Sequence, residues 1–272
     1  MTECSADYCH TPGRSGRCAA WSSRNHSLNF GNARRVARLL NGGGGDDILA
    51  GGDGSDALDG GTGDDVLRGG TGNDYLLADS AGDRIVEAVG EGYDIAFTSA
   101  SFTLEEGSEV EELRVTDAAG SAAINPTGDE FGQRLGGNAG ANVLDGGGGE
   151  DFLDGLDGAD TLNGGSGNDV MNGGSGADVF AFSEIGFADR ILDFVSGTDR
   201  IDLRDIDAVA GSAENDAFNW IGASDFSNVA GQLRSYESGG SNYLAGDVDG
   251  DGTADFLIDL GSTPVVATDI FL

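Results

Sequence analysis

A nine-residue repeat constrains the fold of this chain more than any other feature of its sequence. Four units follow one another from Gly42 to Leu77, and four more from Gly146 to Ala181. Every unit begins with Gly, has Gly at the fourth place and Asp at the sixth, and has an apolar residue at the eighth, as in GGTGDDVLR. Glycine adopts positive φ without steric cost, so the first half of a unit predicts a tight turn. A flexible glycine linker would have no reason to keep Asp and an apolar residue at a fixed period.

The second half of each unit predicts a short strand whose eighth residue points into a core. A turn followed by a strand reverses the chain, so two units complete one coil and units two apart stack on the same side. Stacked coils bury a continuous apolar ladder that one strand could not. The sequence therefore predicts an all-β fold, a parallel β-roll in two arrays. The ladder residues are Leu49, Leu58, Leu67, Leu76, Leu153, Leu162, Met171 and Phe180.

The same stacking aligns the sixth-place carboxylates in rows. Aligned carboxylates repel one another unless a cation lies between them. Together with turn carbonyls they form the oxygen shell that Ca²⁺ accepts, with six to eight ligands and loose geometry. We therefore expect several calcium sites. The predicted carboxylate ligands are Asp47, Asp56, Asp65, Asp74, Asp151, Asp160, Asp169 and Asp178. The predicted carbonyl ligands are the opening glycines Gly42, Gly51, Gly60, Gly69, Gly146, Gly155, Gly164 and Gly173.

Two units upstream of the second array keep the period but lack the acid. GDEFGQRLG starts at Gly128 and GNAGANVLD at Gly137, with Gln133 and Asn142 at the sixth place. These units predict coils of the roll with weak or absent calcium sites.

A second acidic pattern lies near the C-terminus. Asp247, Asp249, Asp251 and Asp255 occupy places 1, 3, 5 and 9 of an EF-hand-like loop, with Gly at the sixth place. Place 12, where a bidentate acid is expected, holds Ile258, and the flanking residues predict strands. The pattern leaves an additional calcium site and a plain acidic hairpin turn both open.

Charge excludes one class of partner and favours another. The chain has 48 acidic and 14 basic residues and a formal net charge of −34. Nucleic acid is excluded as the obvious partner because phosphate binding needs the opposite sign. Such charge also opposes a compact state by self-repulsion, so folding is expected to depend on cations. No apolar stretch is long enough to span a membrane.

These repeats resemble the RTX, or haemolysin-type, calcium-binding repeat. The resemblance implies that two successive turns on one side of a parallel β-roll hold each calcium ion. It also implies export by the type I secretion apparatus of a Gram-negative bacterium into the extracellular space. The terminal sequence Asp269-Ile270-Phe271-Leu272 resembles the uncleaved C-terminal signal of such proteins. The order of motifs after about Gly146 is similar to the C-terminal domain of the serralysin metallopeptidases.

These observations divide the chain into five predicted segments. They are a basic, disordered leader (1–41), a first β-roll array (42–78), a β-rich spacer (79–127), a second array (128–182) and a serralysin-like C-terminal β domain with the secretion signal (183–272). Within the last segment, 189–194 and 197–203 predict a pair of strands around a turn.

The sequence predicts a binding protein and not an enzyme. It has no HExxH helix and no GxSxG elbow, and no histidine follows His26. The predicted function is a secreted, monomeric calcium-binding protein whose roll folds on binding extracellular Ca²⁺ as an export and folding module. One alternative is a calcium-stabilised surface or matrix adhesin with an unknown protein or polysaccharide partner. Another is a non-catalytic fragment that works with a separate serralysin-type catalytic chain.

Overall fold

The structure is a computed structural model, and it describes residues 17–19, 27–29, 37–211 and 214–272. The chain divides into two compact units, each described by itself. The first unit comprises residues 1–117 and 124–131, and the second comprises residues 118–123 and 132–272.

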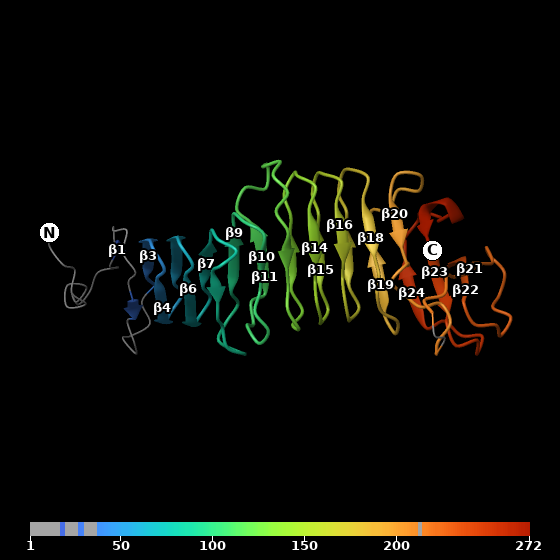
Figure 1. The fold of residues 1–272 in the computed structure, drawn as a ribbon, viewed down its shortest axis with the longest axis horizontal. Helices are drawn as coiled ribbons and strands as arrows, with labels where there is room; N and C mark the ends of the chain where they lie inside the picture. Colours follow the sequence, from blue (N-terminus) through green and yellow to red (C-terminus); the bar gives the residue numbers. More distant parts are fainter. Residues whose placement is uncertain (1–16, 20–26, 30–36, 212–213) are drawn as a thin grey trace. The chain divides into compact units, whose positions relative to one another are not determined.

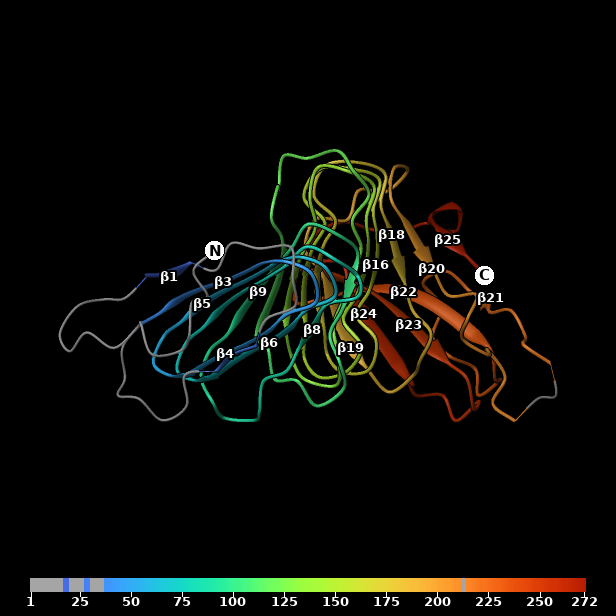
Figure 2. The ribbon, with the colours of Figure 1, turned by 60° about the vertical axis from the view of Figure 1, so that its left-hand side comes forward.

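Parallel strands form the first unit (Figure 1). They join into the rows β1-β3-β5-β7-β9-β11 and β2-β4-β6-β8, and β10 pairs with β12. Figure 2 shows the first two rows as separate layers, with odd-numbered strands in one and even-numbered strands in the other. The described strands are β1 (Arg17–Ala19), β2 (Ser27–Asn29), β3 (Leu39–Gly44), β4 (Ile48–Asp53), β5 (Ala57–Thr62), β6 (Val66–Thr71), β7 (Tyr75–Ala78), β8 (Arg84–Ile85), β9 (Ile95–Thr98), β10 (Phe102–Thr103), β11 (Glu112–Val115) and β12 (Pro126–Thr127).

The register places each repeat against the repeat two units away. Leu58 pairs with Leu40 on one side and with Leu76 on the other, and Leu49 pairs with Leu67. All five leucines are fully buried. An eighth-place side chain alternates with outward neighbours because successive side chains of a strand point to opposite faces. The predicted all-β parallel β-roll is therefore confirmed.

Coils continue past the first array into the segment predicted as a spacer. Ile85 pairs with Leu67, Ala96 pairs with Leu76, and Leu113 pairs with Ala96. These side chains join the same buried cluster as the ladder leucines. Residues 84–98 and 112–115 thus extend the rows of the roll.

The predicted leader lies largely outside the described residues. Within it, the backbones of β1 and β2 pair in parallel with β3 and β4. These two short strands differ from the disordered segment that composition predicts.

The second unit combines a parallel roll with an antiparallel hairpin. The parallel rows are β13-β15-β17-β19-β24 and β14-β16-β18-β20-β25, and β22, β23 and β24 are antiparallel neighbours. The elements are β13 (Arg134–Gly136), β14 (Val143–Asp145), β15 (Phe152–Asp154), β16 (Thr161–Asn163), β17 (Val170–Asn172), β18 (Val179–Ala181), β19 (Ala188–Ile191), β20 (Arg200–Asp202), β21 (Asn219–Trp220), β22 (Gln232–Ser238), β23 (Ser241–Asp247), β24 (Phe256–Asp259), the 3₁₀ helix η2 (Ala267–Asp269) and β25 (Ile270–Phe271).

The predicted pairing of 189–194 with 197–203 is wrong. β19 pairs with β17 and β24, whereas β20 pairs with β18 and β25. Both strands stack on the preceding coil, 20 and 21 residues after their partners instead of the 18 of the arrays, and the intervening turn crosses from one row to the other. A short turn between two apolar runs predicts a hairpin locally, but stacking on the preceding coil places the two strands in different rows.

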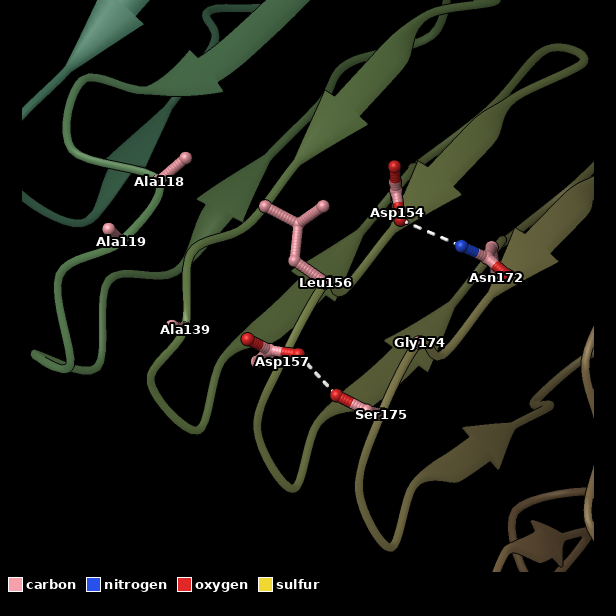
Figure 3. Close-up of a pocket in the computed structure, with 9 residues that line it drawn as sticks. All are labelled: Ala118, Ala119, Ala139, Asp154, Leu156, Asp157, Asn172, Gly174 and Ser175. Carbon is pink, nitrogen blue, oxygen red and sulfur yellow. Dashed lines mark hydrogen bonds between the residues drawn. The ribbon is translucent and has the colours of Figure 1, made fainter.

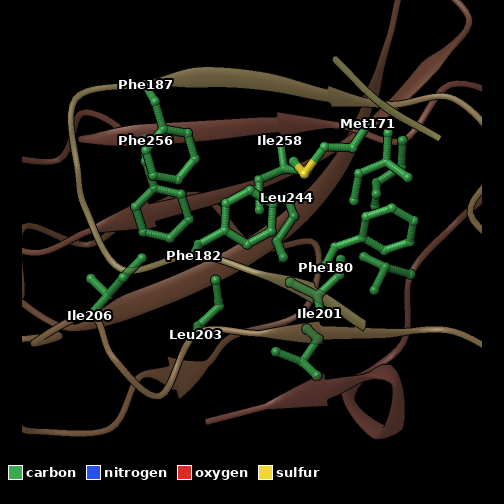
Figure 4. Packing of buried hydrophobic residues seen from close by; sticks show 14 of the residues in the cluster. Met171, Phe180, Phe182, Phe187, Ile201, Leu203, Ile206, Leu244, Phe256 and Ile258 are labelled. Carbon is green, nitrogen blue, oxygen red and sulfur yellow. The ribbon is translucent and has the colours of Figure 1, made fainter. Parts of the chain in front are cut away.

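Aromatic residues close the core of the second unit beyond the repeats. The ring centroids of Phe182 and Phe187 are 5.3 Å apart, and those of Phe187 and Phe256 are 5.4 Å apart. Figure 4 shows these rings beside Met171, Phe180 and Ile258, which belong to the same cluster. No helix in the described part of the chain is long and apolar enough to cross a membrane.

The ladder predicts that buried and exposed side chains of paired strands contribute very differently to the free energy of unfolding. Leu162→Ala removes a side chain with no exposed surface and should lower the free energy of unfolding by about 2–5 kcal/mol. Val143→Ala, on a side chain 47% exposed in the paired strand, should change it by less than about 0.5 kcal/mol. Urea unfolding in saturating calcium measures both; equal losses would contradict the ladder.

Candidate calcium sites

The turns are built so that only glycine fits at their opening place. At Gly51, a Cβ atom would lie 2.5 Å from Oδ2 of Asp56 and 2.7 Å from the carbonyl oxygen of Gly69. At Gly155, it would lie 2.5 Å from Oδ2 of Asp160 and 2.6 Å from the carbonyl oxygen of Gly173. A sixth-place carboxylate oxygen and the carbonyl of the opening glycine one coil later therefore share one small space. This brings together the two kinds of oxygen that the sequence proposes as calcium ligands.

Every predicted sixth-place aspartate is buried, and in seven of the eight one carboxylate oxygen accepts a hydrogen bond from the backbone. Oδ1 of Asp65 accepts a hydrogen bond from the backbone N–H of Asp47 at 2.6 Å, and Oδ1 of Asp178 accepts one from Asp160 at 2.9 Å. Each bond joins positions 18 residues apart, one coil. The same bond recurs from Arg38 to Asp56, Asp56 to Asp74, Gln133 to Asp151, Asn142 to Asp160, and Asp151 to Asp169.

The other carboxylate oxygen is left for a cation. Within the described residues, the buried Oδ2 atoms of Asp65, Asp74, Asp160 and Asp169 have no hydrogen-bond donor. A buried, unsatisfied charged oxygen is costly. Calcium prefers carboxylate and carbonyl oxygens and tolerates irregular geometry, so this set of oxygens fits it.

Burial also raises the pKa of these carboxyl groups. The pKa values of Asp65, Asp74 and Asp160 rise to about 6, because loss of hydration outweighs the backbone hydrogen bonds that lower them. Neighbouring carboxylates of the same row raise them further. Those of Asp56, Asp169 and Asp178 are raised for the same leading reason. Without a metal ion, the rows are electrostatically unfavourable when fully ionised.

In each unit, the rows of aspartates extend past the C-terminal end of the array, to residues that the sequence analysis missed. Asp83 and Asp94 accept the backbone N–H groups of Asp65 and Asp74. In the second unit, Asp189 and Asp199 accept those of Asp169 and Asp178. Burial raises the pKa of Asp94 and Asp189 to about 7. The sequence does contain a signal for these four residues, because each begins an Asp-x-apolar triplet like places 6 to 8 of a repeat. In three of the four cases, two or three residues are inserted before the triplet, so that it falls outside the nine-residue period.

An acidic side chain ends each array. Within the second array, the opening glycine donates its N–H to a backbone carbonyl one coil later, as Gly155 does to Asn172. At the last turn, Asp193 accepts the N–H groups of Gly173 and Gly174 instead. Glu87 does the same for Gly69 and Gly70. Burial raises the pKa of Glu87 to about 8.

Gln133 and Asn142 lie at the sixth place as predicted and bring no carboxylate. Both are buried. Oδ1 of Asn142 accepts the backbone N–H of Asn138, and its Nδ2 donates to Oδ1 of Asn138. The amide is therefore engaged locally, consistent with a coil that lacks its own acidic ligand.

Three of the four acids in the second acidic pattern lie together. Carboxylate oxygens of Asp247, Asp249 and Asp255 lie within 4.8 Å of one another. Asp251 is not in this group; it accepts hydrogen bonds from Thr253, which lower its pKa. Ile258, at place 12, is fully buried in the core. The loop between β23 and β24 keeps three candidate ligands and lacks the bidentate acid, so an additional calcium site there stays a prediction.

A surface hollow of about 680 Å³ lies on the second unit (Figure 3). Two polar pairs lie on it: Nδ2 of Asn172 donates to Asp154 at 2.9 Å, and the Ser175 hydroxyl donates to Asp157. Leu156 stands where seven of the eight repeats have glycine, and its φ of 75° lies in the left-handed region. Such a conformation costs a leucine about 1–2 kcal/mol. The remaining lining residues are Ala118, Ala119, Ala139 and Gly174.

Comparison with known proteins identifies the repeats. The RTX calcium-binding nonapeptide repeat matches four times, at residues 41–76, 50–85, 127–162 and 151–180. Among the solved structures that match is the AlgE6R3 subunit of the mannuronan C5-epimerase of Azotobacter vinelandii, solved in solution. The two sequences are 28% identical, and the match covers 52% of this chain and 78% of the AlgE6R3 chain, with a TM-score of 0.39. No curated protein sequence matches the chain. The chain thus carries RTX calcium-binding repeats folded as a parallel β-roll.

The raised pKa values predict how the calcium-free protein responds to pH. An unfolded aspartate titrates near 3.9, so between about pH 4 and 7 the folded state binds more protons than the unfolded state. Stability must then fall as pH rises through this window. We expect EGTA-treated protein to keep more β-type circular dichroism at pH 5 than at pH 7.5, where the ionised rows oppose folding without calcium.

A second measurement isolates the metal. Calcium displaces protons from these carboxyl groups, so titration calorimetry near pH 6.5 should give heats that depend on the ionisation enthalpy of the buffer. A β-type signal in EGTA that is stronger at pH 7.5 than at pH 5 would contradict the assignment.

Proposed function

We propose that this chain is an exported protein whose β-rolls fold when they bind extracellular calcium. One observation carries the proposal: within the described residues, four buried sixth-place carboxylates leave Oδ2 without a protein donor, close to the turn carbonyls, namely those of Asp65, Asp74, Asp160 and Asp169. A cation there satisfies the unpaired oxygens and relieves repulsion along the row.

The magnitudes support a switch between unfolded and folded states. Calcium at ten times its Kd stabilises the folded state by about 1.4 kcal/mol for each site. About five such sites would contribute about 7 kcal/mol, comparable with the whole stability of a domain. Extracellular modules bind calcium with Kd values of about 10⁻⁴–10⁻³ M. Sites of that affinity are filled outside a cell and nearly empty in the cytosol.

The C-terminal residues fit export before folding. Asp269 is buried and accepts hydrogen bonds from the Ser196 hydroxyl and the Gly197 N–H, and Ile270 pairs with Ile201. A secretion apparatus that reads this segment would need the chain unfolded, as it would be at cytosolic calcium. We propose type I secretion from a Gram-negative cell and a monomeric product on this basis.

Calcium titration tests the folding proposal. We expect β-type circular dichroism to appear with calcium and to vanish with EGTA. Asp160→Asn should raise the calcium midpoint and remove bound calcium, because it weakens the site shared with Asp178; Asn142 shows that the sixth place accepts an amide. The control Asp154→Asn makes the same charge change outside the turn and should leave the midpoint unchanged. A spectrum that ignores both calcium and EGTA would overturn the proposal.

We also propose that the chain is not itself an enzyme. Support comes from the sequence: the order of motifs after Gly146 is similar to the serralysin C-terminal domain, yet the chain has no HExxH segment. Hydrolysis of casein by the calcium-loaded protein would overturn this.

The hollow on the second unit favours a second candidate function, binding of a polysaccharide. Asp154, Asn172, Asp157 and Ser175 offer paired acceptors and donors of the kind that hydroxyl groups use, and the alanines leave room for a sugar ring. The two carboxylates disfavour a polyanion and favour a neutral polymer. Retardation in gels that contain a neutral polysaccharide, lost in Asn172→Ala, would support it; equal migration with and without the polymer would not.

A further inference from the structure

Arg38 occupies a sixth place of the nine-residue frame. Counting back nine residues from Asp47 reaches Arg38, and Leu40 then stands at the eighth place. The structure keeps this register, since Leu40 is fully buried and pairs with Leu58. The Arg38 backbone N–H donates to Oδ1 of Asp56 at 2.7 Å, as every other sixth-place residue does to the aspartate one coil later.

The Arg38 side chain does what no aspartate could do. Its Nη1 donates to the carbonyl oxygen of Gly51 and lies 3.4 Å from Oδ2 of Asp56. The Arg38 side chain is 13% exposed and that of Asp56 is fully buried. The guanidinium therefore bridges the carbonyl of an opening glycine and a sixth-place carboxylate, the two kinds of oxygen that form the candidate calcium sites.

The second unit provides a natural comparison. Asp160, like Asp56, follows one coil after a sixth-place residue that is not acidic, in this case Asn142. Oδ2 of Asp160 has no donor in the described part of the chain, because the Asn142 amide is engaged with Asn138. At Asp56 the corresponding oxygen has a cation beside it.

Given the proposed calcium-dependent folding, on which this inference rests, we propose that Arg38 is a built-in cation that replaces calcium at the first position of its row. The position shared by residues 38 and 56 takes the guanidinium, whereas the next position along the row, shared by Asp56 and Asp74, takes a metal ion. The coil that contains Arg38 is thereby held to the next coil without calcium. Because a stacked-repeat protein can nucleate at one place and propagate, this coil is a starting point for calcium-driven folding of the coils that follow.

Counting bound calcium tests the replacement directly. Arg38→Asp restores an ordinary sixth place, so it should bind one more calcium ion per chain than the wild type, measured by equilibrium dialysis with titration calorimetry. The control is Arg68→Asp, which makes the same charge change at an exposed residue of the same unit and should leave the number unchanged. The same number of ions in Arg38→Asp as in the wild type would overturn the proposal.

A second variant separates the cation from the metal site. Arg38→Gln removes the charge without offering a carboxylate, so it should bind as many ions as the wild type but need about twice the calcium to fold, because the calcium sites must make up the lost charge-assisted contact. Arg68→Gln should fold at the wild-type midpoint. Equal midpoints for the two glutamine variants would overturn the inference, whereas a wild type that binds no calcium would overturn the proposed function.

Discussion

The hydrogen bond from a backbone N–H to the sixth-place carboxylate one coil later is the interaction on which the structure depends. It helps to fix the register between coils, because it ties each carboxylate to the backbone of the residue one coil earlier, as in Asp65 with Asp47. In Asp65, Asp74, Asp160 and Asp169 it also separates a structural oxygen from a second oxygen that has no hydrogen-bond donor among the described residues. Charge-assisted hydrogen bonds of this kind are strong. The burial that accompanies them raises the pKa of the acid, so the bond that aligns the coils also creates the need for a cation.

That constraint explains how the rows begin and end. At the far end of each array an acidic side chain, Glu87 or Asp193, accepts the glycine N–H groups that would otherwise lack a carbonyl. At the start of one row in the first unit, Arg38 supplies positive charge to the carboxylate of Asp56. A repeat protein needs atypical residues at its ends because the interactions between neighbouring coils stop there. The charges are opposite because the acidic side chains meet backbone N–H donors, whereas Arg38 meets a carbonyl oxygen and a carboxylate.

Much of this follows from the nine-residue period, and the exceptions have a common cause. The period predicts the ladder leucines and the alignment of Asp160 over Asp178, because both depend on spacing alone. It fails for Asp94, Asp189 and Asp199, because inserted residues between coils break the spacing while the stacking continues. Asp83 keeps the spacing of 18 residues, but its unit has alanine where the repeat has its first and fourth glycines. The expected hairpin of 189–194 and 197–203 failed because each strand pairs with the strand one coil earlier in its own row and not with the other strand. In the acidic loop, spacing predicted four acids together, but Thr253 holds Asp251 outside the cluster.

The sequence by itself determined the chemistry of this protein: a turn that only glycine tolerates, a buried apolar rung, and a carboxylate of the type that calcium accepts, repeated at one period. Only the tertiary structure decided which oxygen of each carboxylate stays unsatisfied, where the rows stop, and that a guanidinium stands at one cation position. The physical reason is that periodicity specifies contacts between identical neighbours. At the ends and at the insertions the neighbours differ, and there each group finds its partner through packing and the need to satisfy buried charge.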